Sequence, residues 1–538
     1  MSLNLTMIVA LLASSCAALM GSRALIHFFQ LESYQFPGYL RSIRRNGVQV
    51  WVPGFYLFLA HAAAWMLYIL LGNGVWQAFL WAALILGSGA LISRDLKTIK
   101  AKKPLVFTAR VKRLCAVVFL VSLGIRICCV CLMTGVRGVP ARVFLSCVWM
   151  AFPLMLPVLV LLAGMLAAPM EKFIQNLYFR DAQRILRSRP DLIKIGITGS
   201  YGKTSVKFIL GTLLSEKYQT LVSPASFNTP MGLTKVIRNS LTPSHQVFVA
   251  EMGARHVGDI RELCRLVHPE IGLLVSIGPQ HLETFGSMER IAGTKYELMD
   301  AIPGSGCCFF LDDGGTVTDL YEKTEKPKML ASVKPGTGDV WAENMEVSQN
   351  GSTFLLCTRT QRIPCTTRLL GEHNIGNILL AASVCFHLGM TGTQISRGIS
   401  QLEPVEHRLQ LLPTAGGITM IDDAFNSNPR GAHAALQVLK RFPERRIIVT
   451  PGMVELGADE EKYNYDFGVE MAACVDLAIL VGPKRTKAIQ QGLMDGGFEK
   501  EKMFVVKSLD EATGVMRSLA RRGDTVLFEN DLPDNYSE

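Results

Sequence analysis

Charged residues are scarce in this chain, and they are unevenly spread. Only 19% of the 538 residues are charged, whereas 49% are hydrophobic. Long apolar runs crowd residues 1–170, and the remainder has the composition of an ordinary globular protein. One soluble domain therefore does not account for the sequence. The distribution predicts a membrane-embedded part followed by soluble domains.

The chain also lacks a basic region set apart from its apolar runs. A net charge of +10 would suit a nucleic-acid partner, but the basic residues lie largely beside the apolar runs. In that position they suit the anionic surface of a membrane. We therefore expect a membrane partner and no nucleic-acid partner.

The cysteines lack the spacing of a zinc site. Cys128, Cys129 and Cys131 form one C-x-x-C pattern inside an apolar run, with no second pair and no nearby histidine cluster. Packing inside a membrane helix explains them better than metal binding. Cysteines of the second half, such as Cys264 and Cys385, have no evident pairing, which fits a reducing cytosol.

Five apolar segments reach the about 20 residues that a helix needs to cross a bilayer core. Basic residues are frequent after the first segment and in the loop 94–113, whereas the loop after the fourth has only Arg137 and Arg142. This asymmetry places the N-terminus outside and everything after about residue 170 in the cytoplasm of a multi-pass cell-membrane protein. The segments are 4–22, 49–72, 74–93, 114–135 and 143–168, with Asn73 and Gly74 forming a tight turn.

Charge is nearly absent from the spans themselves. No positive charge lies in Met1–Thr6, so an uncleaved first span is favoured over a cleaved signal peptide. Arg126 lies inside the fourth span, where a charge is costly and often functional. Snorkelling or pairing within the bundle is the structural alternative, but the sequence shows no obvious acidic partner.

The sequence changes character at Leu192. Ile193–Thr198 predicts a short strand and Val206–Ser215 a helix, with T-G-S-Y-G-K-T-S between them. A glycine loop in this context lets backbone N–H groups close on phosphate oxygens. The spacing G-x-x-G-K-T is shorter than the usual phosphate loop, so a purely structural turn is the alternative. The nucleotide-binding candidates are Gly199, Ser200, Gly202, Lys203, Thr204 and Ser205.

Within this loop, Lys203 is expected to neutralise the β- and γ-phosphates of a nucleotide, and Thr204 to offer its hydroxyl to Mg²⁺. Two further strand patterns end in groups suited to the same metal: Val247–Glu251 ends in an acid, and Ile271–Ile277 precedes His281. Because strand ends on one edge of a parallel sheet face the ligand crevice, Glu251 and His281 are expected to approach that metal. A hydrogen-bonded structural histidine is the alternative for His281.

Eight motifs follow one another through the second half of the chain. They are T-G-S-Y-G-K-T-S (198–205), S-F-N-T-P-M-G (226–232), E-M-G-A-R-H-V-G-D-I (251–260), G-P-Q-H-L-E-T-F-G-S (278–287), A-G-T-K-Y-E (292–297), G-E-H-N-I-G-N (371–377), D-D-A-F-N-S-N-P (422–429) and M-V-E-L-G (453–457). Their order resembles that of the Mur ligases of bacterial cell-wall synthesis, over about residues 190–530. Within that family the motifs are most similar to the ligases that add D-alanyl-D-alanine to a UDP-linked muramoyl tripeptide.

The resemblance implies roles for individual positions of the central domain. Lys203 and Thr204 would handle the phosphates and Mg²⁺, and Glu251 and His281 would ligate Mg²⁺. Asn228 would lie near a second metal site. Lys295 matches the lysine that the family carbamylates to supply a carboxylate to the metal site. A surface lysine on the helix Arg290–Met299 is the plain alternative.

The remaining implied roles concern nucleotide contacts and domain closure. Asn377 matches the adenine contact. Arg408 and Asp422 of the C-terminal domain would contact phosphate and ribose once the domains close, and Asn426 and Asn428 would lie near the reacting groups. The catalytic residues implied in this way are Lys203, Lys295, Arg408 and Asn426.

The implied activity is an ATP-dependent, carbon–nitrogen bond-forming ligase in cell-wall or cell-surface polymer synthesis. Transfer of the γ-phosphoryl group to a carboxylate makes an acyl phosphate, which an amine attacks. Such transfer needs charge neutralisation and alignment, which Lys203, the metal sites and Arg408 would supply. ATP and Mg²⁺ are the implied cofactors.

The fold expected is α/β with an N-terminal helical membrane bundle. Residues 1–170 are the bundle, residues 171–400 a phosphate-loop domain with a parallel sheet, and residues 401–538 a Rossmann-like domain that closes over it. Residues 331–366 predict a small β insertion. The last domain is predicted from short apolar runs at 417–421, 446–450, 477–481, 503–506 and 525–528.

Two departures from the family bear on the substrates. The membrane segment and the stretch Glu171–Pro190 stand where soluble members have a domain that helps to hold the UDP-linked substrate. The chain reads L-F-E-N-D at 527–531, where a Lys-Gly-Ser-type turn is usual. Both departures leave the identity of the substrates open without affecting the ATP chemistry. A UDP-linked muramoyl tripeptide is one alternative for the carboxylate acceptor, and a lipid-linked or membrane-proximal acceptor fits better. An amino acid, a dipeptide or another amine would be the donor.

Two alternative functions remain open at the level of sequence. One is a polymer-forming ligase, such as a poly-γ-glutamate or capsule synthase. The other is a transporter or membrane regulator whose ligase-like half only senses nucleotide. Degenerate metal positions would favour the second alternative, but Glu251, His281 and Lys295 are all present.

Overall fold

The chain divides into two compact units, Met1–Leu177 and Tyr178–Glu538. The structure, a computed structural model, describes residues 5–71, 75–95, 104–135, 138–224, 227–414, 416–424 and 427–530. The expected turn at Asn73–Gly74 and Asn426 lie outside the described residues, as do the lysines of the loop 96–103. The boundary between the units falls within a helix.

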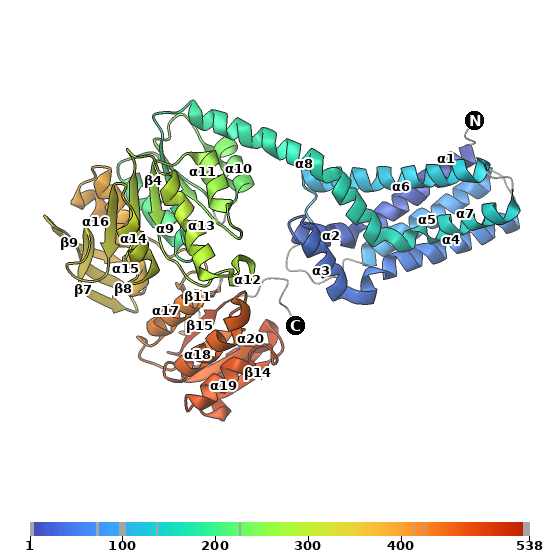
Figure 1. The fold of residues 1–538 in the computed structure, drawn as a ribbon. Helices are drawn as coiled ribbons and strands as arrows, with labels where there is room; N and C mark the ends of the chain where they lie inside the picture. Colours follow the sequence, from blue (N-terminus) through green and yellow to red (C-terminus); the bar gives the residue numbers. More distant parts are fainter. Residues whose placement is uncertain are drawn as a thin grey trace. The chain divides into compact units, whose positions relative to one another are not determined.

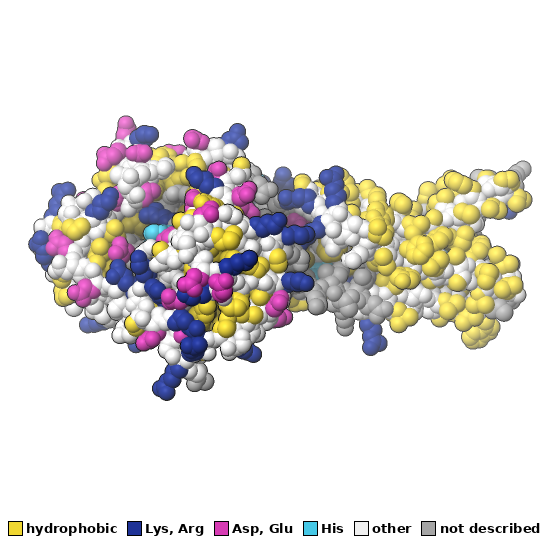
Figure 2. Space-filling view, turned by 90° about the horizontal axis from the view of Figure 1, so that it is seen from below, with side chains coloured by type: hydrophobic (Ala, Val, Ile, Leu, Met, Phe, Trp, Pro, Cys, Tyr) yellow, Lys and Arg dark blue, Asp and Glu magenta, His cyan; other side chains and the backbone are white. Residues whose placement is uncertain are grey.

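The described part of the first unit is built of helices (Figure 1). Small residues let these helices approach closely, since a Cβ on Gly89 would lie 3.1 Å from the Cα of Ala17. Large apolar side chains remain exposed, for example Trp76 at 83% and Leu70 at 72%. Figure 2 shows hydrophobic side chains gathered over this unit. The helices are α1 (Leu5–Gly21), α2 (Arg23–Leu31), α3 (Phe36–Asn46), η1 (Gly47–Val50), α4 (Val52–Leu71), α5 (Val75–Asp95), α6 (Ala109–Gly135), α7 (Val139–Ala151), η3 (Phe152–Met155) and α8 (Leu156–Arg187).

Within the described residues, three helical stretches are long and apolar enough to cross a membrane: Trp76–Arg94, Ala109–Gly135 and Val139–Arg187. The number rises to five if each of two bent pairs counts as one span. These pairs are α1 with α2, bent by 43°, and Phe36–Val50 with Val52–Leu67, bent by 48°. The described residues of the five expected apolar segments therefore lie largely on helices. The fifth, however, straddles α7, η3 and α8 and does not end at residue 168.

A carboxylate near the end of the first unit joins α6 to α8. Glu171 is 5% exposed and accepts two bonds from Arg113, Nε to Oε1 at 2.5 Å and Nη2 to Oε2 at 2.8 Å. Arg110 lies 3.9 Å from the same carboxylate, with its guanidinium 3.8 Å from the ring centroid of Tyr34. Glu171 thus packs within the helical unit.

The central domain is organised on a nine-stranded sheet of order β2-β3-β1-β4-β5-β6-β7-β8-β9. The strands from β2 to β7 run parallel, whereas β7, β8 and β9 pair antiparallel. The expected insertion at 331–366 is therefore an antiparallel extension of the same sheet. The strands are β1 (Ile193–Thr198), β2 (Thr220–Val222), β3 (Val247–Glu251), β4 (Ile271–Leu274), β5 (Cys307–Leu311), β6 (Lys328–Ser332), β7 (Val340–Ser348), β8 (Gly351–Thr358) and β9 (Arg362–Thr367).

Helices cover both faces of this sheet (Figure 1). One core is formed with α9 and α15, whose buried residues include Leu210 and Ile378. The other is formed with α11 and α13, whose buried residues include Leu263 and Leu298. The helices are α9 (Lys203–Ser215), α10 (Pro230–Ser240), α11 (Asp259–Val267), α12 (Leu282–Phe285), α13 (Met288–Ala301), α14 (Thr316–Lys323), α15 (Glu372–His387) and α16 (Gly392–Ser400).

The C-terminal domain has a six-stranded sheet of order β10-β11-β15-β12-β13-β14. Only the β10–β11 pair is antiparallel, so the expected doubly wound parallel architecture is confirmed. The elements are β10 (Gln410–Pro413), β11 (Thr419–Asp423), α17 (Pro429–Leu439), β12 (Arg446–Thr450), η4 (Gly457–Asp459), α18 (Glu460–Ala472), β13 (Leu477–Val481), α19 (Lys487–Asp495), η5 (Lys500–Lys502), β14 (Met503–Val506), α20 (Leu509–Leu519) and β15 (Thr525–Glu529).

The pair between Arg113 and Glu171 should stabilise the helical unit measurably. Arg113→Gln leaves a nearly buried carboxylate without its bidentate partner, and we expect unfolding to become easier by about 1–3 kcal/mol. Thermal unfolding of the full-length protein in detergent measures this. The double variant Arg113→Gln/Glu171→Gln should recover most of the loss. The control is Lys112→Gln at the exposed neighbouring residue. If Lys112→Gln lowered the stability as much as Arg113→Gln, the assignment would be contradicted.

Candidate functional site

The predicted phosphate loop lies between β1 and α9, at the carboxyl edge of the parallel strands. Gly202 has φ +78°, and a Cβ there would lie 2.8 Å from Val275 Cγ1 and 3.1 Å from Asn377 Oδ1. Glycine is thus required both by conformation and by space. Lys203 Nζ donates to the carbonyls of Gly199 at 2.6 Å and Ser200 at 2.9 Å. The loop is compact, and its lysine lies over the backbone of the loop.

The carboxylate of Glu251, at the end of β3, gathers groups from three segments. It is 2% exposed, and its Oε1 accepts from Thr204 Oγ1 at 3.2 Å and from Asn228 Nδ2 at 3.1 Å. Lys207 Nζ lies 2.9 Å from its Oε2. Burial alone would raise the pKa of Glu251, but the charges of Lys207 and Lys203 outweigh it and lower the pKa. The structure therefore brings Thr204, Asn228 and Glu251 together around an ionised oxygen donor.

Lys295 is buried on α13 and is not a surface lysine. Its exposure is 2%, so the plain alternative from the sequence is wrong. Burial, together with the charge of Lys203, lowers the pKa of Lys295 well below its usual value, although Asp259 opposes the shift. A buried amine with a low pKa is uncharged more often than a surface lysine and is therefore more nucleophilic.

His281 is held by the C-terminal domain. Its Nδ1 lies 2.6 Å from Oε2 of Glu455, in the loop after β12. Both residues have positive φ, +55° for His281 and +65° for Glu455, which is uncommon for side chains of this size. The bond therefore joins two strained turns across the interdomain boundary. Because Nδ1 of His281 is engaged by Glu455, it is not available to the group around Glu251.

The expected set of metal ligands is only partly assembled. Across the described ranges, no group of three or more His, Cys, Asp or Glu side chains is arranged to hold a metal ion. Thr204 and Glu251 are in contact, whereas the hydrogen bond of His281 is made to Glu455. Oxygen donors are the ligands that Mg²⁺ prefers, and it keeps several waters. Thr204 and Glu251 therefore offer oxygen donors of the kind that Mg²⁺ prefers.

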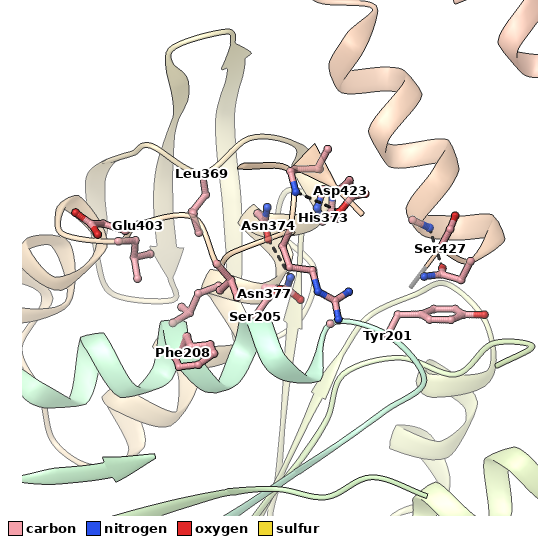
Figure 3. Close-up of a pocket in the computed structure, with 18 of the residues that line it drawn as sticks. Tyr201, Ser205, Phe208, Leu369, His373, Asn374, Asn377, Glu403, Asp423 and Ser427 are labelled. Carbon is pink, nitrogen blue, oxygen red and sulfur yellow. Dashed lines mark hydrogen bonds between the residues drawn. The ribbon is translucent and has the colours of Figure 1, made fainter. Parts of the chain in front are cut away.

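A cavity of about 120 Å³ opens between α9, α15 and the C-terminal domain (Figure 3). Asn377 lies in its wall, 5% exposed, and donates through Nδ2 to Asn374 Oδ1 at 3.2 Å. Gly202, Ser205 and Arg408 reach the same cavity, so four of the predicted nucleotide contacts meet here. Sequence reasoning missed other lining residues: Tyr201, Phe208, His373, Asn374, Glu403, Asp423, Ser427 and Glu529.

The two aspartates of the D-D-A-F motif have different surroundings. Asp422, the predicted ribose contact, places its Oδ2 2.7 Å from His407 Nδ1. Asp423 lines the cavity instead. Successive side chains on a strand point to opposite faces, so only one of the two can face the nucleotide cavity from β11. The strand alternation of β11 indicated that Asp422 and Asp423 face opposite sides, but it did not indicate which of them faces the cavity.

A second acid approaches Asp423 from the neighbouring strand. Asp423 of β11 pairs in register with Glu529 of β15, and Glu529 is 1% exposed. Burial raises the pKa of Asp423 to about 6, against the charge of Arg408, and burial beside Asp423 raises the pKa of Glu529 well above its usual value. Ser427 Oγ donates to Glu529 Oε1 at 2.5 Å. Burial thus favours the protonated form of both carboxyl groups relative to an exposed acid.

Asn428 has a structural contact of its own. It is the N-cap of α17, with its Oδ1 accepting from the N–H of Gly431 at 2.8 Å, and it also lines the cavity. Asn426 lies outside the described residues, so its predicted catalytic role stays a prediction.

The Asp423–Glu529 pair should make stability fall as pH rises. A carboxyl group whose pKa is raised on folding contributes fully to the stability of the folded state at low pH. This contribution is lost as the pH rises through the pKa of the group in the folded protein. Glu529→Gln removes the cost of ionising the pair. The difference in the free energy of unfolding between the variant and the natural protein should therefore be about 1–3 kcal/mol larger, in favour of the variant, at pH 8 than at pH 5. Thermal unfolding at both pH values measures the gain. Exposed Glu501→Gln serves as control, and a gain independent of pH would contradict the explanation.

Comparison with known proteins covers the same two domains. Residues 197–385 match the Mur ligase middle domain, and residues 407–529 match the Mur ligase glutamate ligase domain. The UDP-N-acetylmuramoyl-tripeptide–D-alanyl-D-alanine ligase of Escherichia coli (strain K12) is 33% identical over 316 residues, covering 58% of this chain and 70% of that protein. The protein of the same name from Mycobacterium bovis is 32% identical over 358 residues, covering 62% and 69%.

Solved structures agree with the sequence relatives. A crystal structure of MurF from Acinetobacter baumannii superposes with a TM-score of 0.60 and 26% identity, covering 66% of this chain and 77% of that one. MurF from Thermotoga maritima in complex with ADP shares the fold, with a TM-score of 0.60, 23% identity, and coverage of 66% and 80%. The two family matches begin after the helical unit. This chain belongs to the Mur ligase family, whose members are ATP-dependent ligases that form carbon–nitrogen bonds.

Proposed function

We propose that this protein is a membrane-anchored ligase that activates a carboxylate as an acyl phosphate and joins it to an amine. One observation carries the proposal. The phosphate loop, with Lys203 and Thr204 beside the ionised Glu251, adjoins a cavity that Arg408 of the C-terminal domain also lines. Groups that neutralise and align a phosphoryl group thus converge from two domains, as phosphoryl transfer requires.

The residues of the loop and cavity fit ATP. The backbone of the loop and the close approach at Gly202 favour a polyphosphate, and Asn377 and Asp423 offer polar contacts to base and sugar. Bound ATP would supply the phosphoryl group that amide formation later releases as phosphate. Lys203 and Arg408 would offset the charge that develops during transfer. Thr204 and Glu251 would hold Mg²⁺ through oxygen.

Lys295 fits the role of a carbamylated lysine. Carbamylation requires an uncharged amine, and burial lowers the pKa of Lys295 strongly. The carbamate would add a negative oxygen donor near Lys203, whose charge now disfavours protonation of Lys295. His281, fixed by Glu455, would approach the site only while the two domains are together.

We further propose that the acceptor is a cell-wall precursor at the cytoplasmic face of the membrane, lipid-linked or UDP-linked, and that a dipeptide or amino acid is the donor. The relatives are named for joining D-alanyl-D-alanine to a UDP-N-acetylmuramoyl tripeptide. Here the residues before the matched region form apolar helices with three to five candidate spans. A site tethered to the membrane raises the effective concentration of an acceptor confined to the same surface.

Lys295→Ala should lose ATP-dependent ligation, and bicarbonate depletion should lower the activity of the natural protein. If a carbamate is required, a small carboxylic acid such as acetate should restore part of the activity of Lys295→Ala, because it supplies the missing oxygen donor. Release of ADP with a cell-wall precursor and an amine measures this. Buried Lys207→Ala, which removes a charge beside Glu251, is the control that acetate should not rescue. Full activity of Lys295→Ala would exclude the role.

A shortened protein that begins at Tyr178 tests membrane positioning. It keeps both α/β domains and the buried Ala182 and Leu186 of α8, so it should bind ATP with an affinity near that of the full chain. With a lipid-linked precursor in vesicles, the full chain should form product at least about tenfold faster. Lys203→Ala in both lengths gives the inactive baseline. Equal turnover of both lengths on a soluble UDP-linked precursor, with no advantage on the lipid-linked one, would defeat the membrane proposal.

A further inference from the structure

Arg126 is a fully buried cation in the helical unit. It lies on the stripe of α6 that faces the interior, with Val118, Ser122 and Val130, and its exposure is 1%. It therefore does not snorkel to the surface. None of its three guanidinium nitrogens has a hydrogen-bond partner in the described part of the chain. Leaving such a group without an acceptor costs several kcal/mol, so its retention needs an explanation.

The helical unit has very few acids that could neutralise this charge. The sequence up to Leu177 contains only Glu32, Asp95 and Glu171. Glu32 accepts from Ser42, and Glu171 is occupied by Arg113. Asp95 ends α5, and its side chain lies outside the described part of the chain. Both acids whose side chains are described are therefore engaged by other groups.

The surroundings of Arg126 are suited to an oxyanion. Ser122 lies one helical turn earlier on the same stripe, is 0% exposed, and its Oγ also has no partner among the described residues. A guanidinium fork and a hydroxyl are the donor set that a carboxylate or a phosphate accepts. On another side, the guanidinium carbon lies 5.0 Å from the ring of Trp149 and 4.8 Å from that of Phe152. These rings stabilise the cation but accept no conventional hydrogen bond.

We propose that Arg126 and Ser122 form a binding site for the acidic group of an amphiphile, a phosphate or carboxylate carried on an apolar chain. The acidic group would accept from the guanidinium and from Ser122 Oγ. The apolar chain would lie against Trp149, Phe152 and the apolar surface of the helices. An amphiphile fits better than a free ion because the surroundings of the site are apolar, so an ion would lose its hydration without compensation. This site is independent of the ligase site.

Binding of dodecyl phosphate to the full-length protein in a neutral maltoside detergent tests the site. The natural protein should bind it saturably, with a rise in the midpoint of thermal unfolding. Arg126→Met should weaken binding by about tenfold or more, since a charge-assisted bidentate contact is lost. Arg126→Met should also unfold at a higher temperature than the natural protein when no ligand is added. Exposed Arg142→Gln on α7 is the matched control and should bind as the natural protein does.

Three further binding measurements identify the chemistry of the ligand and include a variant that is expected to fold normally. Dodecanoate at pH 8 tests a carboxylate head group, and inorganic phosphate tests a free ion. If inorganic phosphate competed as strongly as dodecyl phosphate, the site would still be an anion site, but the proposal that its ligand is an amphiphile would be overturned. Ser122→Ala removes a hydroxyl only and should weaken binding by about threefold to tenfold. Undiminished binding to Ser122→Ala and Arg126→Met, or no binding to the natural protein, would overturn the site.

Discussion

The ionised carboxylate of Glu251 is the group on which the ligase half depends. It ends β3 deep in the central domain, and Lys207, which is 0% exposed, stabilises its charge at 2.9 Å. Thr204 and Asn228 reach it from the phosphate loop and from the segment before α10. An ion pair of this depth contributes little net stability, because desolvation offsets the attraction. The ion pair instead fixes positions. The buried negative charge of Glu251 holds Thr204, the first turn of α9 and Asn228 in place.

Features of the fold and the site that depend on a few neighbouring residues could be predicted from the sequence. Features that depend on residues far apart along the chain could not. Strands β1, β3, β12, β13 and β14 were predicted with their observed bounds, because short apolar runs between turn residues are local signals. The phosphate loop followed for the same reason. The burial of Lys295 was not visible, because it depends on what packs against α13. The bond from His281 to Glu455 joins residues 174 positions apart, and no local pattern predicts it. For the helical unit, α2 and α3 were missed because they are too short and too polar to register as spans.

The central and C-terminal domains are coupled through polar groups rather than through an apolar interface alone. His281 and Glu455 occupy left-handed turns, which cost about 1–3 kcal/mol each. Their mutual bond at 2.6 Å offsets part of this cost only while both domains are in place. Arg408, Asp423 and Glu529 form a second set at the cavity, where burial raises the pKa of both acids and the charge of Arg408 opposes the shift.

The two units treat buried charge in opposite ways, and the contrast bears on function. In the ligase half, Lys207 lies 2.9 Å from the buried carboxylate of Glu251, and burial raises the pKa of Asp423 while the charge of Arg408 opposes this rise. In the helical unit Glu171 is compensated by Arg113, but Arg126 is not compensated by any described group. Glu251 and Glu171 each have a cationic partner within the chain, so Arg126 would be expected to have an acidic one as well if stability were the only requirement. Replacement by an apolar residue would remove the cost at once. The persistence of an uncompensated guanidinium beside a second unpaired donor is therefore better explained by an external anion than by packing.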